Sequence, residues 1–220
     1  MQVTSNFYSV DFEQIPLDPF WNTGDGKECK MHRIHAYPAK FPAFITTKAI
    51  EFVKKRGVDV RLVADIFCGC GTVAHETKKN GLCFWGCDIN PVATLIAETK
   101  SHIYNDEVLK CYTEAILNSF SSSYIEDCEI ENVNSRIKYW FKTEQIKDLL
   151  ILKKIIFSTV ADDKYYLNFF LCAFSNILKA TSVWLTKSIK PQVDPHKTPA
   201  NVINSFVKQV SMMRWKFHRK

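Results

Sequence analysis

Two short apolar runs, each followed at once by an aspartate, form the clearest pattern in the chain. The first run, residues 60–64, precedes Asp65, and the second, residues 82–87, precedes Asp88. Apolar runs of this length that end in turn residues are typical of buried parallel strands. The residues between them, 72–79, suit a helix that links the two strands. The pattern therefore predicts a strand–helix–strand unit.

Longer stretches predict helices on both sides of this unit, because apolar residues recur in them at three- and four-residue spacing. The first of these helices ends in basic residues followed by Gly57, which suits a helix carboxyl end. Asn90 and Pro91 suit the cap and the first turn of the helix expected over residues 92–99. Asp162 is expected to cap a third. The expected helices cover residues 44–56, 92–99, 143–159, 163–181 and 201–213.

The expected helix over residues 163–181 carries aromatic and aliphatic residues on one face. Such a stripe could be mistaken for a surface on which nucleic-acid bases stack, but helical spacing is more typical of a core or interface face. The stripe consists of Tyr166, Phe169, Phe170, Ala173, Phe174, Ile177 and Leu178.

A serine-rich and acidic stretch, residues 119–131, reads as a polar loop. We therefore expect a boundary near residue 120. Residues 1–120 would hold an amino-terminal arm and an α/β core, and residues 121–220 a helical, basic region. No run of about 18 apolar residues occurs, and the first residues lack a signal-peptide pattern, so a membrane span is not expected. A cytoplasmic location is the expectation.

The positive charge lies mainly at the carboxyl end. Residues 178–220 hold nine basic residues and one acid, whereas residues 1–177 carry a net charge of −2. Lysines in a proline-bounded loop suit contacts with DNA phosphates. The candidate DNA-binding residues are Lys187, Lys190 and Lys197. The basic tail, residues 216–220, reads more simply as a solvated end.

The turn after the first strand contains two glycines, Gly69 and Gly71, which allow the backbone to turn tightly and lie close to a ligand. Thr72 then opens a helix whose unpaired N–H groups would face that ligand. A carboxylate at the next strand tip, Asp88, suits the hydroxyls of a ribose. The pattern favours a site for a nucleotide-like ligand, with an ordinary turn that binds nothing as the alternative.

No metal site is expected from the sequence. Cys68, Cys70, Cys83 and Cys87 have a spacing that is atypical of structural zinc sites, and reduced thiols are the simpler interpretation. A histidine pair, His32 and His35, is more often a packing or surface feature than a catalytic one.

Three segments together resemble the site-specific DNA amino-methyltransferases. Residues 35–42 (HAYPAKFP) are similar to that family's H-P-Y-P-A-K-F segment, residues 65–72 (DIFCGCGT) to its D-P-F-x-G-x-G-T motif, and residues 86–93 (GCDINPVA) to its G-x-D-x-N-P-x-A motif. Residues 188–195 resemble a further family segment with lower specificity. Ala36 and Ile66 stand where the family usually has proline.

The resemblance implies a partial Rossmann-like α/β fold that binds S-adenosylmethionine, followed by a helical insert and a basic carboxyl-terminal segment. It places Tyr37, Lys40 and Phe41 at the methionine end of the cofactor. Asp88 would hold the ribose, and Ile89 would pack on the adenine. The loop beneath the cofactor would consist of Asp65, Phe67, Gly69 and Gly71.

The family's [DNS]-P-P-[YFW] motif, which holds the target amine, has no counterpart here because the chain contains no Pro-Pro pair. The resemblance therefore implies the cofactor-binding part of an enzyme that methylates an exocyclic amine of cytosine or adenine in DNA. The catalytic residues would come from a second chain or a further carboxyl-terminal part. A non-catalytic nucleic-acid-binding subunit is the alternative, and a methyltransferase for RNA or small molecules is a third reading.

Overall fold

The computed structural model describes residues 12–14, 16, 18–21, 29–38, 40–186, 188 and 190–218. Its sheet has two parallel strands, β1 (Leu62–Asp65) and β2 (Cys83–Gly86), which pair in register from one end to the other. Helix α2 (Thr72–Lys79) joins them. The expected strand–helix–strand unit is therefore confirmed, with each strand slightly shorter than the apolar run that predicts it.

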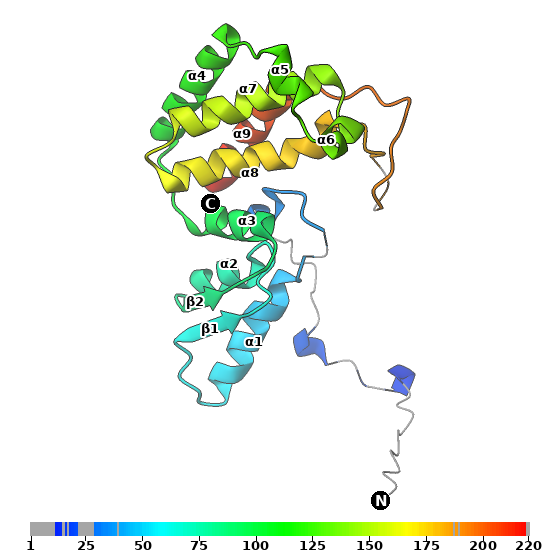
Figure 1. Ribbon diagram of the computed structural model, residues 1–220. Helices are drawn as coiled ribbons and strands as arrows, with labels where there is room; N and C mark the ends of the chain where they lie inside the picture. Colours follow the sequence, from blue (N-terminus) through cyan, green and yellow to red (C-terminus); the bar gives the residue numbers. More distant parts are fainter. Residues whose placement is uncertain are drawn as a thin grey trace, which may run out of the picture.

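Two helices flank this unit. Helix α1 (Ala43–Lys55) packs against α2, and α3 (Pro91–Ser101) packs against the opposite side of α2. Both helix ends follow the expected chemistry: Gly57 adopts a left-handed φ of 79° after α1, and the side chain of Asn90 accepts the Val92 N–H at 3.0 Å. In Figure 1 the strands, α1 and α2 form one end of the molecule.

The remaining helices form a bundle at the other end of the molecule, and α3 joins the two parts by packing on α8 (Figure 1). These helices are α4 (Asp106–Ser122), α5 (Asp127–Glu131), α6 (Ser135–Trp140), α7 (Thr143–Thr159), α8 (Lys164–Thr181) and α9 (Val202–His218). One hydrophobic core runs from Cys70 in the glycine turn, through Ile96 in α3, to Phe206 in α9. The glycine turn is therefore anchored in the core that the bundle shares with α3.

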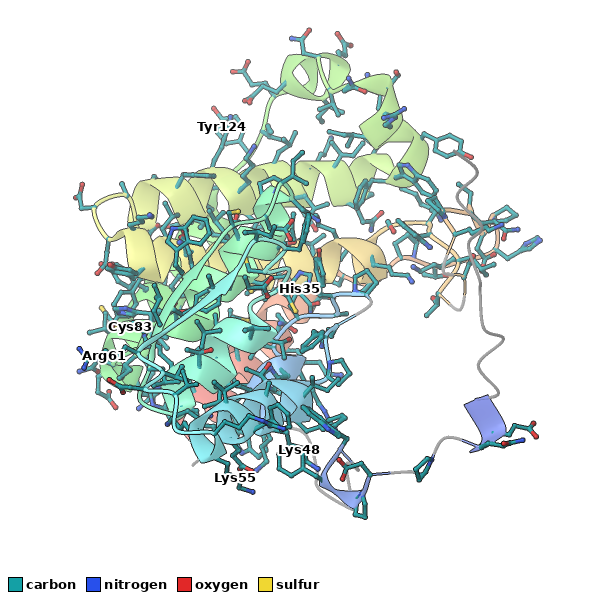
Figure 2. All side chains as sticks on the ribbon, turned by 90° about the horizontal axis from the view of Figure 1, so that it is seen from below. His35, Lys48, Lys55, Arg61, Cys83 and Tyr124 are labelled. Atoms are coloured by element: carbon teal, nitrogen blue, oxygen red, sulfur yellow. The ribbon has the colours of Figure 1, made fainter. Side chains whose placement is uncertain are left out.

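An amino-terminal arm with three short 3₁₀ helices, η1 (Phe12–Gln14), η2 (Pro19–Trp21) and η3 (Lys30–Arg33), precedes α1. Helix η2 lies on α1, where the ammonium groups of Lys48 and Lys55 are 5.5 and 5.0 Å from the centre of the Phe20 ring. Figure 2 labels both lysines, and it also shows Arg61 and Cys83 together at the starts of the two strands.

The aromatic stripe of α8 is confirmed as core. Phe169 and Phe170 are fully buried, and Phe170 lies 6.3 Å from the ring of Phe206 in α9. Because α3, α7 and α9 cover this face, it is not available for stacking bases.

Several local expectations are wrong. Residues 119–122 continue α4, which the periodicity did not reveal, because Ser121, Ser122 and Ser123 hydrogen-bond to carbonyls of the preceding turn. The cap of α8 is Asp163, not Asp162, since its carboxylate accepts the Tyr165 N–H at 3.1 Å. Helix α9 continues to His218 instead of ending at residue 213.

Helix α4 also runs through residue 120, and the division into residues 1–120 and 121–220 stays a prediction. The mixed α/β class is confirmed, with helices far outnumbering strands among the described residues. None of the helices described is both long and apolar enough to cross a membrane.

Candidate functional site

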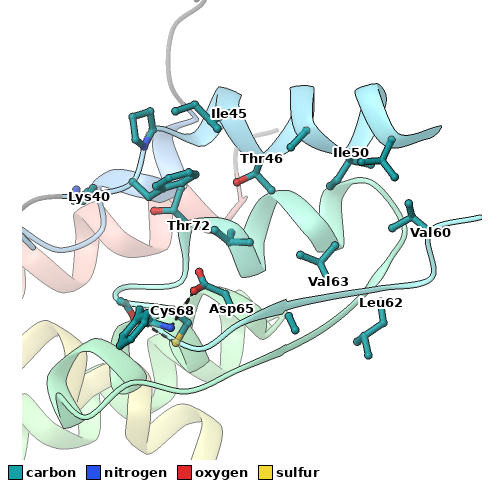
Figure 3. Close-up of a pocket in the computed structure, with 18 of the residues that line it drawn as sticks. Lys40, Ile45, Thr46, Ile50, Val60, Leu62, Val63, Asp65, Cys68 and Thr72 are labelled. Atoms are coloured by element: carbon teal, nitrogen blue, oxygen red, sulfur yellow. Dashed lines mark hydrogen bonds between the residues drawn. The ribbon is translucent and has the colours of Figure 1, made fainter. Parts of the chain in front are cut away.

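A groove of about 1120 Å³ runs between α1 and β1 and ends at the glycine turn. Figure 3 shows its wall of α1 side chains, including Ile45, Thr46 and Ile50, facing Val63 and Asp65 of β1. Most of the exposed lining is apolar. Asp65 and the turn lie at the end of the groove where β1 stops, which is the usual place for ligands in parallel sheets, and Asp59 and Arg61 lie at the other end.

The two glycines of the turn have different roles. At Gly69, where φ is 49°, an added Cβ would meet no atom closer than 3.9 Å, and one of its nearest neighbours is the ring of Tyr37. At Gly71, where φ is 74°, an added Cβ would lie 2.6 Å from the Cβ of Ala97 in α3. Gly69 therefore leaves space beside Tyr37, whereas Gly71 allows α3 to pack closely against the start of α2.

Two carboxylates shape the turn. Asp88 accepts the Gly69 N–H at 2.9 Å through one oxygen and the Asn90 N–H at 2.8 Å through the other. Asp65 accepts the Phe67 N–H at 3.0 Å. Because a carboxylate has about four lone-pair directions, each group retains acceptor capacity for hydroxyls or a cation.

Aromatic and basic side chains border the same end of the groove. Phe67 is 82% exposed and Phe41 is 47% exposed, which is unusual for phenylalanine and suits rings that a ligand covers. The ammonium group of Lys40 donates to the carbonyl of His32, so this lysine fixes the segment that carries Tyr37 and Phe41.

A buried lysine that the sequence pattern did not reveal lies beneath the turn. Lys100 of α3 is 5% exposed and donates from Nζ to the Cys70 carbonyl at 2.7 Å. Burial lowers the pKa of Lys100 below its usual value. Burial, together with the carboxylates of Asp88 and Asp65, raises the pKa of the Cys68 thiol, so the turn carries a protonated thiol at neutral pH.

The structure brings most of the expected cofactor residues together. Gly71 and Asp88 adjoin the groove through the turn, and the side chain of Ile89 is fully exposed outside it. The expected residues that line the groove are Tyr37, Lys40, Phe41, Asp65, Phe67, Gly69 and Thr72. Their contacts with a cofactor stay predictions.

The expected DNA-binding lysines differ from one another. Lys187 lies outside the described residues, and Lys190 is exposed. Lys197 donates from Nζ to the carbonyls of Lys179 at 2.9 Å and Trp184 at 2.8 Å, and burial lowers its pKa. Its ammonium group therefore stabilises the loop between α8 and α9 through internal hydrogen bonds.

The chain was compared with known proteins. Residues 6–99 match the family model described as DNA methylase. The type II methyltransferase M.MvaI of Kocuria varians is 29% identical over 189 residues, which cover 81% of this chain and 41% of that protein. The type II methyltransferase M.MjaII of Methanocaldococcus jannaschii is 30% identical over 116 residues, which cover 51% of this chain and 21% of that protein.

The chain thus spans less than half the length of these curated relatives. No solved structure matches it significantly. The three motifs at residues 35–42, 65–72 and 86–93 lie within the matched region, and DNA methylases of this family use S-adenosylmethionine as methyl donor. Residues 6–99 of the chain are thus similar to the DNA methylase family that the motifs indicated.

Proposed function

We propose that the turn and the end of the groove bind S-adenosylmethionine, and that the chain is the cofactor-binding part of a DNA methyltransferase acting on an exocyclic amine of cytosine or adenine. Gly69 carries this proposal, because Asp88 holds its N–H and its missing side chain leaves room beside the Tyr37 ring. When bound, S-adenosylmethionine supplies a sulfonium methyl group to the target nitrogen.

The residues of the site fit the chemistry of such a ligand. Asp88 holds the ribose hydroxyls with its remaining lone pairs while it keeps the Gly69 N–H in place. Asp65 lies at the cationic end, where its charge favours a positively charged ligand. Phe67 and Phe41 cover the apolar parts and exclude water. Ile89 is proposed to lie along the adenine, although its side chain is fully exposed.

We further propose that the missing acceptor half of the site docks along β1. Among the described residues β1 pairs only with β2, and Leu62 is 58% exposed. A parallel sheet of only two strands is unusual, because parallel sheets are normally extended by further strands and covered on both faces.

The groove next to the edge of β1 that faces away from β2 has a volume of about 1120 Å³ and continues from the turn along α1 and β1, where apolar side chains line it. The curated relatives contain much additional sequence beyond the matched part. We propose that a strand carrying the [DNS]-P-P-[YFW] motif, on a second chain or a further carboxyl-terminal segment, covers this edge and presents the base to the methyl group.

For DNA contact, Lys190 is the better candidate of the two described lysines, since it is exposed while Lys197 is held by two carbonyls. Phosphate contacts of this kind would make binding to DNA sensitive to salt.

Titration calorimetry with S-adenosylmethionine tests the cofactor proposal. We expect saturable binding to the wild-type chain and none to Asp88→Ala, together with no transfer of tritium-labelled methyl groups to DNA by the chain on its own. Salt-dependent DNA binding without cofactor binding would instead favour a non-catalytic nucleic-acid-binding subunit.

A further inference from the structure

Four side chains with metal-binding chemistry meet between η3 and α2, away from the groove. They come from two segments, since Cys29 and His32 lie at the start of η3 and His75 and Glu76 lie in α2. One ligand atom from each of His32, His75 and Glu76 lies within 4.8 Å of the others. The thiol of Cys29 lies beside His75, with Sγ 3.8 Å from Nε2.

The distances suit one tetrahedral ion. His32 Nε2 lies 3.0 Å from Glu76 Oε1, in addition to the 3.8 Å contact between Cys29 and His75. Zinc bonds of roughly 2.0–2.3 Å space the ligand atoms of a tetrahedral site roughly 3.3–3.6 Å apart. The separation within each pair therefore differs by roughly 0.2–0.6 Å from that of a tetrahedral site. The ligand atoms of His32, His75 and Glu76 lie within 4.8 Å of one another, and the Cys29 thiol, which lies outside this group beside His75, has to move toward them to complete the set.

The two central side chains of the cluster are shielded from water. His32 is 0% exposed, and its Nδ1 has no hydrogen-bond partner among the described residues. Glu76 is 3% exposed, and its nearest cationic side chain, Lys79, is 3.6 Å away and itself well exposed. His32 Nε2 and Thr47 donate to the two oxygens of this carboxylate, at 3.0 and 3.1 Å. A cation bound between Nε2 and Glu76 would therefore replace the proton that His32 shares with Glu76.

The four residues also match the ligand preference of Zn²⁺. Neutral imidazoles, one thiolate and one carboxylate form a mixed nitrogen, sulfur and oxygen set that zinc accepts, and the two anionic ligands cancel its charge. The spacing Cys29-x₂-His32 is within the range that structural zinc sites use for paired ligands.

We propose that Cys29, His32, His75 and Glu76 bind a structural zinc ion that fastens η3 to α2. On binding, the Cys29 thiol loses its proton to solvent and the thiolate becomes a ligand. The ion would fix the position of η3 relative to α2, the helix that follows the glycine turn. It would thereby also fix the His32 carbonyl, to which Lys40 donates. The proposal does not depend on the cofactor proposal, because none of the four side chains lines the groove.

Metal analysis of the full chain, purified without a histidine tag, tests the site. We expect one zinc per chain by elemental mass spectrometry. Cobalt should replace it, with the near-ultraviolet absorption of a thiolate–cobalt bond. X-ray absorption at the zinc edge should show one sulfur and three nitrogen or oxygen neighbours. A folded chain that binds neither metal, or a zinc spectrum without a sulfur neighbour, would overturn the proposal.

Variants identify the ligands. Cys29→Ser should abolish the cobalt–thiolate band, and His75→Asn should weaken zinc binding by about 10–100-fold or more. Cys111→Ser changes an exposed thiol elsewhere and should alter neither result. Wild-type zinc affinity and an unchanged cobalt band in Cys29→Ser would place the metal elsewhere and refute the assignment. If either variant fails to fold, the sulfur neighbour in the wild-type spectrum decides.

Discussion

Asp88 and Gly69 are joined across the carboxyl ends of the two strands by a hydrogen bond of 2.9 Å from the glycine N–H to the carboxylate. The residue proposed to hold a ribose is thus also the residue that fixes the turn beneath the cofactor. Ligand affinity and turn geometry therefore depend on the same side chain, and substitutions there can separate the two roles.

Substitutions at Asp88 should lower cofactor affinity in two steps. Asp88→Asn keeps an oxygen that can accept the Gly69 N–H but loses the charge, so we expect roughly tenfold weaker binding, the effect of about 1.4 kcal/mol. Asp88→Ala should remove measurable binding and lower the free energy of unfolding by roughly 1.5–3 kcal/mol, since a hydrogen bond to a charged group is lost.

Calorimetry and urea denaturation measure these two effects. Asp162→Asn, at an exposed position that does not cap α8, is the matched control and should change neither quantity. Equal cofactor affinity in all three variants would contradict the role of Asp88.

Alanine substitutions should show which glycine leaves room for the ligand and which allows two helices to pack closely. Gly81→Ala should cost only the strain of a left-handed backbone, roughly 1 kcal/mol, because an added Cβ meets nothing within 4 Å. Gly69→Ala should cost about the same strain but should also weaken cofactor binding, since the methyl group enters the open space.

Gly71→Ala should be the most destabilising of the three, by roughly 1–3 kcal/mol beyond the strain, because the methyl group collides with Ala97. Urea denaturation and cofactor titration of the three variants check this order. A Gly69→Ala chain with wild-type cofactor affinity would show that the space beside Tyr37 is not part of the ligand site.

Much of this framework could be predicted from the residues. Apolar runs and their flanking glycines located β1, β2 and α2, and the bounds of α7 were predicted to the residue. Helix α4 was missed because its serines resemble a loop in sequence, whereas their hydroxyls bond to helix carbonyls in the structure.

Features that depend on contacts distant in sequence could not be predicted. The buried position of Lys100 depends on the packing of α3 beneath the turn, and the meeting of Cys29 with His75 joins residues 46 positions apart. Sequence spacing reveals ligands on one element, such as Cys29 and His32, but not which distant helix completes the set.

The ion pair between Asp106 of α4 and Arg214 of α9 should stabilise the bundle modestly. The guanidinium donates to both carboxylate oxygens at 2.9 Å, and its hydrogen bonds hold the pKa of Asp106 below the usual 3.8. Because the pair is partly exposed, Asp106→Asn should lower the free energy of unfolding by about 0.5–1 kcal/mol at neutral pH.

The sign of the pH dependence follows from the lowered pKa. The stabilisation is present above the unfolded value of 3.8 and is lost as pH falls through the folded value, so wild type and Asp106→Asn should converge in acid. Glu107→Gln, on the same turn of α4, is the control and should have a smaller effect. Urea denaturation across pH measures the difference, and a constant gap down to the lowest pH would contradict the account.

His35 should make the protein less stable in mild acid. Burial, with smaller contributions from Lys40 and Lys100, lowers the pKa of His35 from 6.5 to about 4. Between these values the unfolded chain binds more protons than the folded one, so stability should fall as pH drops from 6.5 toward 4.

The contribution of this one group is at most about 1.4 kcal/mol per pH unit. His35→Gln, which can keep a hydrogen bond to Ser175, should make the pH dependence shallower in thermal denaturation experiments. An unchanged slope would mean that His35 does not stay neutral in the folded protein.

Equilibrium dialysis of the wild-type chain against tritium-labelled S-adenosylmethionine tests the central claim most directly. We predict retention of one labelled molecule per chain, displaced by unlabelled cofactor and absent with Asp88→Ala. A folded wild-type chain that retains no label at any cofactor concentration would contradict the assignment of the Gly69–Asp88 turn as the cofactor site.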